Sequence, residues 1–428
     1  MSEFLAPLNY DRARDVLRRL SVYAGYTPQG ARQALDTLRA CYPLVFSKME
    51  VKPFQNEAVL LELAGANVTE PLIFVSHLDA PASAPFPMSA PVHEMPMSVP
   101  LSRAYLVSLL EALEELLRDG YRPGGDLMLA LSMDGLSGGE GAKSIAAHLK
   151  ARSVTPCFVL DYGGYVTMDA FRTLLPAGAP LALIGVTEKG ILQGSVVADE
   201  AVRSRRGRED RQPLPELLRC GARLTRHPRR ASLCNASEQM LRALGLKAPI
   251  SKRFWLSHPR LAFPLMRVFW RGRSVMRQFF LSELSAYAIS APGMPDAPAD
   301  CATLKFCQSI VPGRKTARLK HHLRRLVKND DLRLEYTFDG DASQRSEPKG
   351  EAWDALETAI EIQFERAAIV PCLSPFVTDG RFYAPLGGRV YRFSPFLLTG
   401  EEALCGECSI TDGALQTAVQ FFRSMLSV

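Results

Sequence analysis

Apolar residues follow two different spacings along the first part of the chain. Four short apolar runs have the length of strands: Ala58–Gly65, Pro71–Ala80, Asp126–Asp134 and Cys157–Asp161. Two longer segments, Leu101–Gly120 and Gly139–Ala151, repeat their apolar residues at the spacing of a helix. Strands that alternate with helices predict an α/β sheet with helices on both faces. In such a sheet the chemistry lies where strands end and loops begin.

The pattern changes near Glu188. The segment Glu188–Glu200 resembles the edge of a new sheet, and residues 302–338 follow the order strand, turn, basic helix, strand. After the polar segment Asp339–Gly350, a helix begins near Glu351 and a closing helix resumes the first pattern. We therefore predict a discontinuous main domain, residues 1–187 plus 343–428, that carries an inserted α+β satellite domain, residues 188–342.

Composition narrows the class of protein. The 428 residues are 47% hydrophobic and 22% charged, which is typical of a globular chain with two or three domains. No apolar run reaches the length of a membrane span, and charged residues interrupt the N-terminal segment where a signal peptide needs a continuous apolar stretch. We therefore expect a cytoplasmic protein without a membrane partner.

The cysteines and the net charge argue against a disulfide-stabilised protein and against a nucleic-acid-binding protein. The nine cysteines are scattered and odd in number, so they do not form a disulfide framework. Cys405 and Cys408 have no second pair to complete a zinc site, and we interpret them as free thiols in a loop. The net charge of +6 is modest for this length and does not indicate nucleic acid as a partner.

Polar residues gather at the predicted strand ends, where His77, Asp79, Asp134 and Asp161 all lie. Seven motifs run through nearly the whole chain in a fixed order: "SHLDAP", "LLEALEELLRDGYRP", "SMDGLSGGEGAKSIA", "FVLDYGG", "LIGVTEKG", "SIVPG" and "VTDGRFYAPLGGRVYRFSP". In this order they resemble the co-catalytic zinc exopeptidases and N-acyl amino acid hydrolases. That family includes aminoacylase, succinyl-diaminopimelate desuccinylase and carboxypeptidase S, and the resemblance is greatest to the carboxypeptidase S branch.

The resemblance implies a zinc-exopeptidase-like catalytic domain with an inserted dimerisation domain. It also implies two zinc ions that share a bridging carboxylate, and a glutamate that takes a proton from the bridging water. On this basis His77 matches a zinc ligand and Asp161 matches a terminal carboxylate ligand. Asp79 matches the aspartate that orients the ligand histidine.

The remaining positions of the implied metal site are substituted. Leu101 stands where the resemblance places the bridging aspartate, and Phe382 stands where it places the last histidine ligand. The family's consecutive glutamates, one the general base and one a ligand, are matched by Gly135 and Leu136. Because only two ligands survive, we expect no zinc cofactor, while a single metal bound with a recruited ligand stays open.

Residues that could replace the lost groups are few. His93 and Glu94 lie in a loop near the expected site, and Glu140 lies in a first helical turn, where the helix dipole favours a negative charge. We interpret His93 and Glu94 as solvated loop residues, and Glu140 as a charge that the helix dipole stabilises. In the satellite domain, Asp296 and Ser309 occupy the positions of the family's substrate-gripping asparagine and arginine, so the implied substrate contacts are substituted too.

Three functions remain open at this point. The first is a catalytically degenerate pseudohydrolase that binds or assembles, as a homodimer or as a heterodimer with an active relative, with a small peptide or acyl amino acid as its ligand. The second is a hydrolase of N-acyl amino acids or dipeptides with a rebuilt single-metal site. The third is a basic module that binds an acidic partner through Arg203–Arg230 and "RKTARLKHHLRRLVK", although solvated surface explains these residues as well.

Overall fold

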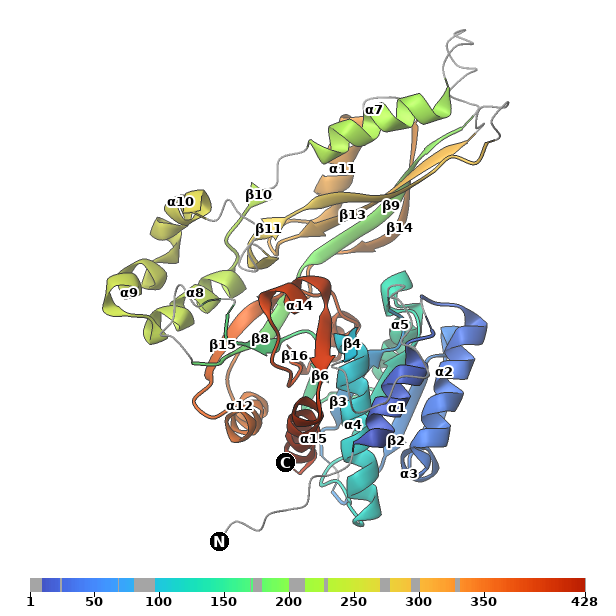
Figure 1. Ribbon diagram of the computed structural model, residues 1–428, viewed down its shortest axis with the longest axis vertical. Helices are drawn as coiled ribbons and strands as arrows, with labels where there is room; N and C mark the ends of the chain where they lie inside the picture. The colour runs from blue at the N-terminus through green and yellow to red at the C-terminus, as the bar shows by residue number, and fades with distance from the viewer. Residues whose placement is uncertain are drawn as a thin grey trace.

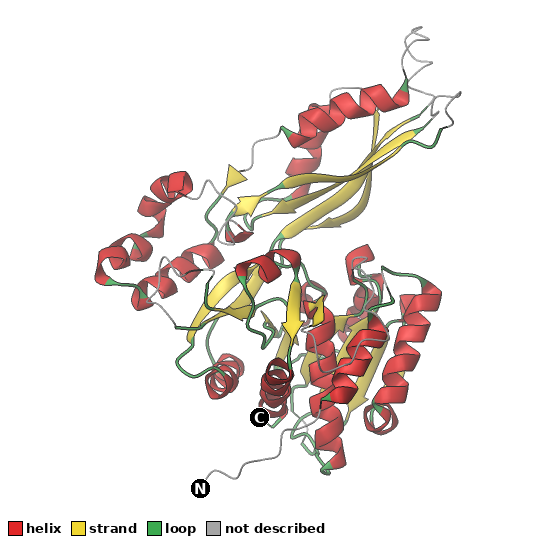
Figure 2. Ribbon diagram, in the orientation of Figure 1, coloured by secondary structure: helices red, strands yellow, loops and turns green. Residues whose placement is uncertain are grey.

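The computed structural model describes the residues 10–23, 25–67, 69–80, 97–169, 171, 179–199, 212–226, 230–269, 278–293, 301–327 and 332–427. Two sheets, each covered by helices, dominate this part of the chain (Figures 1 and 2). None of its helices is both long enough and apolar enough to cross a membrane.

The larger sheet has nine strands among the described residues. They are β1 (Glu50–Pro53), β2 (Val59–Leu63), β3 (Leu72–His77), β5 (Leu127–Ser132), β6 (Phe158–Asp161), β7 (Tyr165–Thr167), β8 (Leu181–Glu188), β15 (Ala368–Ser374) and β16 (Arg389–Arg392). The order is β1-β2-β5-β3-β6-β16-β8-β15, and β7 pairs with β8. β3 is parallel to β5 and β6, whereas β1, β2 and β7 pair antiparallel, so the sheet is mixed.

Helices cover both faces of this sheet, as the sequence predicts. One face carries α1 (Asp11–Leu20), α2 (Pro28–Cys41), α3 (Pro43–Lys48), α4 (Leu101–Arg118), α12 (Glu351–Gln363) and α15 (Asp412–Leu426). The other face carries α5 (Glu140–Ala151) and α13 (Gly380–Tyr383). Neighbouring residues of β3 point to opposite faces: Phe74 joins the core under α4, while Ile73 and Val75 pack with the residues of α5. This alternation fixes which strand-end side chains turn toward the site.

The smaller sheet consists of β9 (Gly190–Ala198), β12 (Leu284–Ser290), β13 (Ala302–Ile310) and β14 (Leu332–Gly340), in the order β12-β13-β9-β14. All its pairings are antiparallel. It projects away from the larger sheet and carries α7 (Pro213–Thr225) and α11 (Thr316–Val327) on one face (Figure 1). The sequence placed β9 at an edge, which is wrong: β9 pairs along both sides, with β13 and β14.

The basic helix α11 buries Thr316, Leu323 and Val327 against this sheet. Arg318, His321, Arg324 and Arg325 are exposed. The described part of the basic segment therefore has an ordinary amphipathic arrangement, with its charge on the solvent side.

Three helices that the sequence did not predict lie between residues 235 and 269: α8 (Asn235–Lys247), α9 (Ile250–Ser257) and α10 (Pro259–Phe269). α8 packs against β15 of the larger sheet, and all three project from one side of the molecule (Figure 1). Short elements complete the chain: β4 (Met97–Pro100), β10 (Arg230–Ala231), β11 (Leu281–Ser282), α14 (Gly400–Cys405) and β17 (Glu407–Ile410). The domain boundaries at 188 and 342 stay a prediction.

Candidate functional site

His77 is the last residue of β3, and its side chain is buried at the end of the larger sheet. Its Nδ1 lies 2.8 Å from Oδ1 of Asp79. Its Nε2 lies 2.8 Å from the hydroxyl oxygen of Tyr162, the residue that follows β6. Both ring nitrogens therefore have protein partners. The second oxygen of Asp79, Oδ2, accepts the backbone N–H of Leu136 at 2.8 Å, which holds this carboxylate in its orienting position.

Asp161 is the last residue of β6 and is fully buried beside β3. One of its carboxylate oxygens accepts the backbone N–H of Tyr162 at 2.7 Å, and the other accepts the backbone N–H of Gly380 at 2.6 Å. The carboxylate is thus held by main-chain donors from its own strand end and from α13. The structure brings His77, Asp79 and Asp161 to one edge of the sheet, as parallel strands require.

Asp379, which the sequence analysis did not single out, is a further buried carboxylate at this site. It precedes α13 and accepts a hydrogen bond from the hydroxyl of Ser132 at the end of β5. Its position inside the motif "VTDGRFY", three residues before Phe382, is the signal that could have identified it.

The charges of these groups depend on one another. Burial lowers the pKa of His77, but the hydrogen bond and charge of Asp79, together with Asp379 and Asp161, outweigh it and raise the pKa to about 9. Burial, then the negative charge of Asp379, raises the pKa of Asp161 to about 7. Burial also raises the pKa of Asp379 to about 6, although the charge of His77 opposes the change. His77 is therefore a cation held among buried carboxyl groups at neutral pH.

Two of the substituted positions carry apolar side chains, Leu101 and Phe382, and a third, Gly135, is packed closely against His77. Leu101 begins α4, is buried in the apolar core and donates its N–H to the carbonyl of Gly406 at 2.9 Å. Gly135 lies in a 3₁₀ turn so close to His77 that an added Cβ would lie 2.7 Å from Cγ of the imidazole. Leu136, next to it, is 43% exposed. The position of the general base therefore has no room for a side chain.

Phe382, at the position of the last histidine ligand, packs where a Cβ on Gly139 would lie 2.7 Å from its ring. The ammonium group of Lys143 lies 5.4 Å from the centre of the Phe382 ring and 5.4 Å from that of Phe338 in β14. The aromatic ring thus takes part in a cation–π contact that joins α5 to the smaller sheet.

The possible replacement residues and the substrate positions either have other partners or lie outside the described residues. Glu140 is in the first turn of α5 and pairs with Lys143 at 2.5 Å. Ser309 lies in β13, where its hydroxyl accepts the N–H of Glu283 at 3.2 Å. His93, Glu94 and Asp296 lie outside the part of the chain that the structure describes.

The donor set does not fit a pair of zinc ions. Nε2 of His77 faces Tyr162, both oxygens of Asp161 accept backbone N–H groups, and Leu101 offers no oxygen for a bridge. Across the described ranges, no group of three or more His, Cys, Asp or Glu side chains is arranged to hold a metal ion.

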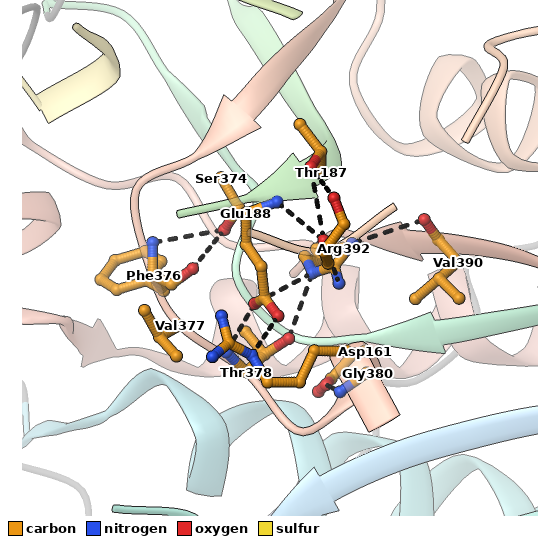
Figure 3. Close-up of polar contacts among 12 residues, drawn as sticks. Asp161, Thr187, Glu188, Ser374, Phe376, Val377, Thr378, Gly380, Val390 and Arg392 are labelled. Carbon is orange, nitrogen blue, oxygen red and sulfur yellow. Dashed lines mark hydrogen bonds and ion pairs between the residues drawn. The ribbon is translucent and has the colours of Figure 1, made fainter. Parts of the chain in front are cut away.

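A second buried cluster, shown in Figure 3, lies where β8 leaves the larger sheet, and the sequence analysis did not predict it. Glu188 accepts hydrogen bonds from Nε of Arg381 at 2.7 Å, from Nε of Arg392 at 3.3 Å and from the N–H of Thr378 at 2.7 Å. Burial would raise the pKa of Glu188, but the charges of Arg381 and Arg392 outweigh it and lower that pKa. Charged residues inside the otherwise apolar motifs "LIGVTEKG" and "VYRFSP" were the available signal.

Comparison with known proteins gives a consistent result, although no family model matches the chain. The human protein "N-fatty-acyl-amino acid synthase/hydrolase PM20D1" is 26% identical over 318 residues, which cover 69% of this chain and 59% of that protein. The "Probable carboxypeptidase S-like 2" of Dictyostelium discoideum is 22% identical over 306 residues, 69% of this chain and 57% of that protein. The chain thus spans about three-fifths of the length of these curated relatives.

Among solved structures, the M20 family metallo-carboxypeptidase Sso-CP2 from Sulfolobus solfataricus matches with a TM-score of 0.67 at 13% identity, over 97% of this chain and 99% of that one. This likeness shows the fold, a mixed α/β main domain that carries a smaller antiparallel sheet with helices on one face. The resemblance seen in the motifs is confirmed: the chain is similar in sequence to an N-fatty-acyl-amino acid synthase/hydrolase and to a carboxypeptidase S-like protein, and it has the fold of an M20 family metallo-carboxypeptidase.

Proposed function

We propose that this chain is a pseudohydrolase, a family member that binds or assembles and does not carry out two-zinc hydrolysis. The observation that supports this most directly is the contact between Nε2 of His77 and the hydroxyl of Tyr162. A zinc ligand needs a neutral imidazole with a free lone pair directed at the metal. His77 instead has both ring nitrogens in contact with protein partners, Nδ1 with Asp79 and Nε2 with Tyr162, so neither is directed at a metal.

The charge of the site supports the same proposal. In a zinc enzyme, the metal ions balance the carboxylates that hold them. Here the His77 cation lies among Asp79, Asp161 and Asp379, and apolar Leu101 and Phe382 stand in place of two further ligands. A carboxylate left at the buried position of Leu101 without a metal would be unpaired, at a high energetic cost.

The partner and the ligand belong to the proposal as well. We propose a cytoplasmic protein without a resident metal, paired through residues 188–342 as a homodimer or with an active relative. Its ligand would be a small peptide or an acyl amino acid, because the name of the human relative specifies N-fatty-acyl amino acids.

One observation favours a second candidate function, that of a hydrolase with a rebuilt single-metal site. Asp379 is close enough to His77 and Asp161 for their charges to change one another's pKa. These three side chains would be the ligands, provided that Tyr162 turned away from His77.

Metal content and hydrolysis distinguish the two candidates. Purified protein exposed to zinc is measured by elemental analysis, and hydrolysis of a panel of N-acyl amino acids and dipeptides is assayed with and without zinc, manganese or cobalt. We expect no stoichiometric metal and no turnover above background. About two zinc ions per chain would overturn the pseudohydrolase. One ion, with an activity that both His77→Ala and Asp161→Ala abolish, would establish the single-metal enzyme.

A further inference from the structure

The helices α8, α9 and α10 project from one side of the molecule (Figure 1). A group of large apolar side chains is exposed on them. Leu246 at the end of α8 is 72% exposed, Ile250, Phe254 and Trp255 in α9 are 85%, 59% and 49% exposed, and Leu261 in α10 is 73% exposed. We call these five residues the α9 surface. Single exposed apolar residues are common in folded proteins, but five on adjoining helices mark an interaction site.

The arrangement of α9 is the reverse of an ordinary surface helix. Leu256 is its one buried side chain among the described residues, and it packs close to Gly245 of α8. At about 100° per residue, Ile250, Phe254 and Trp255 lie within an arc of roughly 140° on the side opposite Leu256. The apolar face of this helix therefore points outward, while a single leucine attaches it to the protein.

Cations border this surface. Lys247, Lys252 and Arg253 are exposed, and they lie on or next to the helix that presents the apolar face. Between 235 and 269 the sequence contains one acidic residue, Glu238, whose carboxylate is already paired with Arg242 at 2.6 Å and with Arg260 at 3.0 Å. The segment is strongly basic around its apolar face.

From this geometry we propose that the α9 surface binds to the surface of an anionic lipid bilayer. Helices that lie in the interface of a membrane combine Trp, Phe and Leu on one face with Lys and Arg beside it, and no spanning segment is needed. The aromatic pair Phe254 and Trp255, with ring centres 5.6 Å apart, would enter the headgroup region, and the flanking cations would meet anionic lipids. This proposal replaces the expectation of no membrane partner.

Charge argues against a second copy of the chain on the same surface. A symmetric dimer would place Lys247, Lys252 and Arg253 of one copy near the same residues of the other, with no free acidic residue in the segment to pair with them. An anionic bilayer provides the complementary charge. The proposal does not depend on whether the chain hydrolyses a substrate.

The test is flotation of the full chain with vesicles of phosphatidylcholine that contain about 30% phosphatidylserine, compared with phosphatidylcholine alone. We expect binding to the anionic vesicles, weakened by salt and reduced at least about tenfold in the variant Ile250→Ser, Phe254→Ser, Trp255→Ser. A matched control, Tyr287→Ser with Ile289→Ser in β12, removes apolar side chains that are 61% and 47% exposed elsewhere and should bind as the unchanged chain does.

Fluorescence gives a second readout that does not depend on the triple variant folding. Trp255 emission should shift to the blue with anionic vesicles, and Trp255→Phe should lack the shift. The proposal is overturned if the unchanged chain does not bind, if it binds neutral vesicles equally well, or if the control loses as much binding as the triple variant. It is also overturned if light scattering gives the mass of a dimer for the unchanged chain and of a monomer for the triple variant, because the α9 surface would then join two copies.

Discussion

The hydroxyl of Tyr162 lies 2.8 Å from Nε2 of His77, the ring nitrogen that Asp79 leaves available. Tyr162 directly follows Asp161, so one strand end supplies both a retained carboxylate and the group that engages the histidine. A residue of the motif that carries Asp161 thus occupies the ring nitrogen of His77 that a metal would need. The histidine, carboxylates and tyrosine of the site form a satisfied polar network, and the stability of that network can be measured.

Tyr162→Phe tests the contact itself. We expect the free energy of unfolding to fall by about 1–3 kcal/mol, because the change leaves a nitrogen of a buried histidine without its partner. Chemical denaturation provides the measurement. Tyr165→Phe is the control, since the buried hydroxyl of Tyr165 has no hydrogen-bond partner among the described residues and its removal should be neutral or stabilising. Equal losses in both variants would show that the His77 contact contributes nothing specific.

Gly135→Ala tests whether the general-base position is closed. The added Cβ would lie 2.7 Å from Cγ of His77, whose ring is buried and held at both nitrogens, so we expect destabilisation of about 1–3 kcal/mol. Leu136→Glu, at the neighbouring half-exposed position, should change stability by less than about 0.5 kcal/mol. If Gly135→Ala is as stable as the unchanged protein, the turn has room for a side chain.

Glu188→Gln tests the cluster of Figure 3. Removing this charge leaves Arg381 and Arg392 buried without their counter-ion, and we expect a loss of about 3–5 kcal/mol in unfolding free energy. Glu347→Gln, in an exposed pair with Arg345, should lose no more than about 1 kcal/mol.

The same carboxylate predicts a dependence on pH. Because the pKa of Glu188 is lower in the folded chain than its ordinary value of 4.5, its contribution is present above that value and is lost as the pH falls below it. The acid-induced loss of stability should therefore be smaller in Glu188→Gln. An unchanged acid profile in this variant would contradict the assignment.

Lys189→Met tests a buried cation. Burial lowers the pKa of Lys189 from 10.5 to about 8, although Glu283 opposes the change. Charging a lysine whose pKa is lowered by folding destabilises the folded state. This penalty is absent above pH 10.5, grows as the pH falls toward 8 and is fully present at neutral pH. We expect the variant to be more stable at pH 7 by on the order of 2 kcal/mol, with a difference that shrinks toward pH 10. Thermal unfolding across this pH range measures both effects.

The sequence predicted the elements whose apolar pattern is long and regular. The runs around Phe74, Leu129 and Leu160 became β3, β5 and β6, and the helical repeat from Leu101 became α4. Strands buried on both faces read as continuous apolar runs, which is why these predictions held. The family motifs then indicated which strand ends carry the polar side chains.

The missed features depend on contacts that no local pattern contains. The helices of the middle segment were not predicted, yet a proline at or just before the first turn of a helix marks its start, as Pro249 and Pro259 do in α9 and α10. The engagement of His77 by Tyr162 depends on side chains 85 positions apart in the sequence, and so does not follow from either motif alone. The edge assignment of β9 failed because its second partner, β14, comes more than a hundred residues later.

A single residue, Lys189, separates β8 of the larger sheet from β9 of the smaller one. The returning segment is also bound to β8: the N–H of Ser346 donates to the carbonyl of Val186 at 2.8 Å, and the hydroxyl of Thr187 donates to the carbonyl of Ser343 at 2.7 Å. Neither connection is a flexible linker, so loss of one sheet removes the anchor of the other. The two sheets should therefore melt cooperatively, as one calorimetric transition, although each has a hydrophobic core of its own.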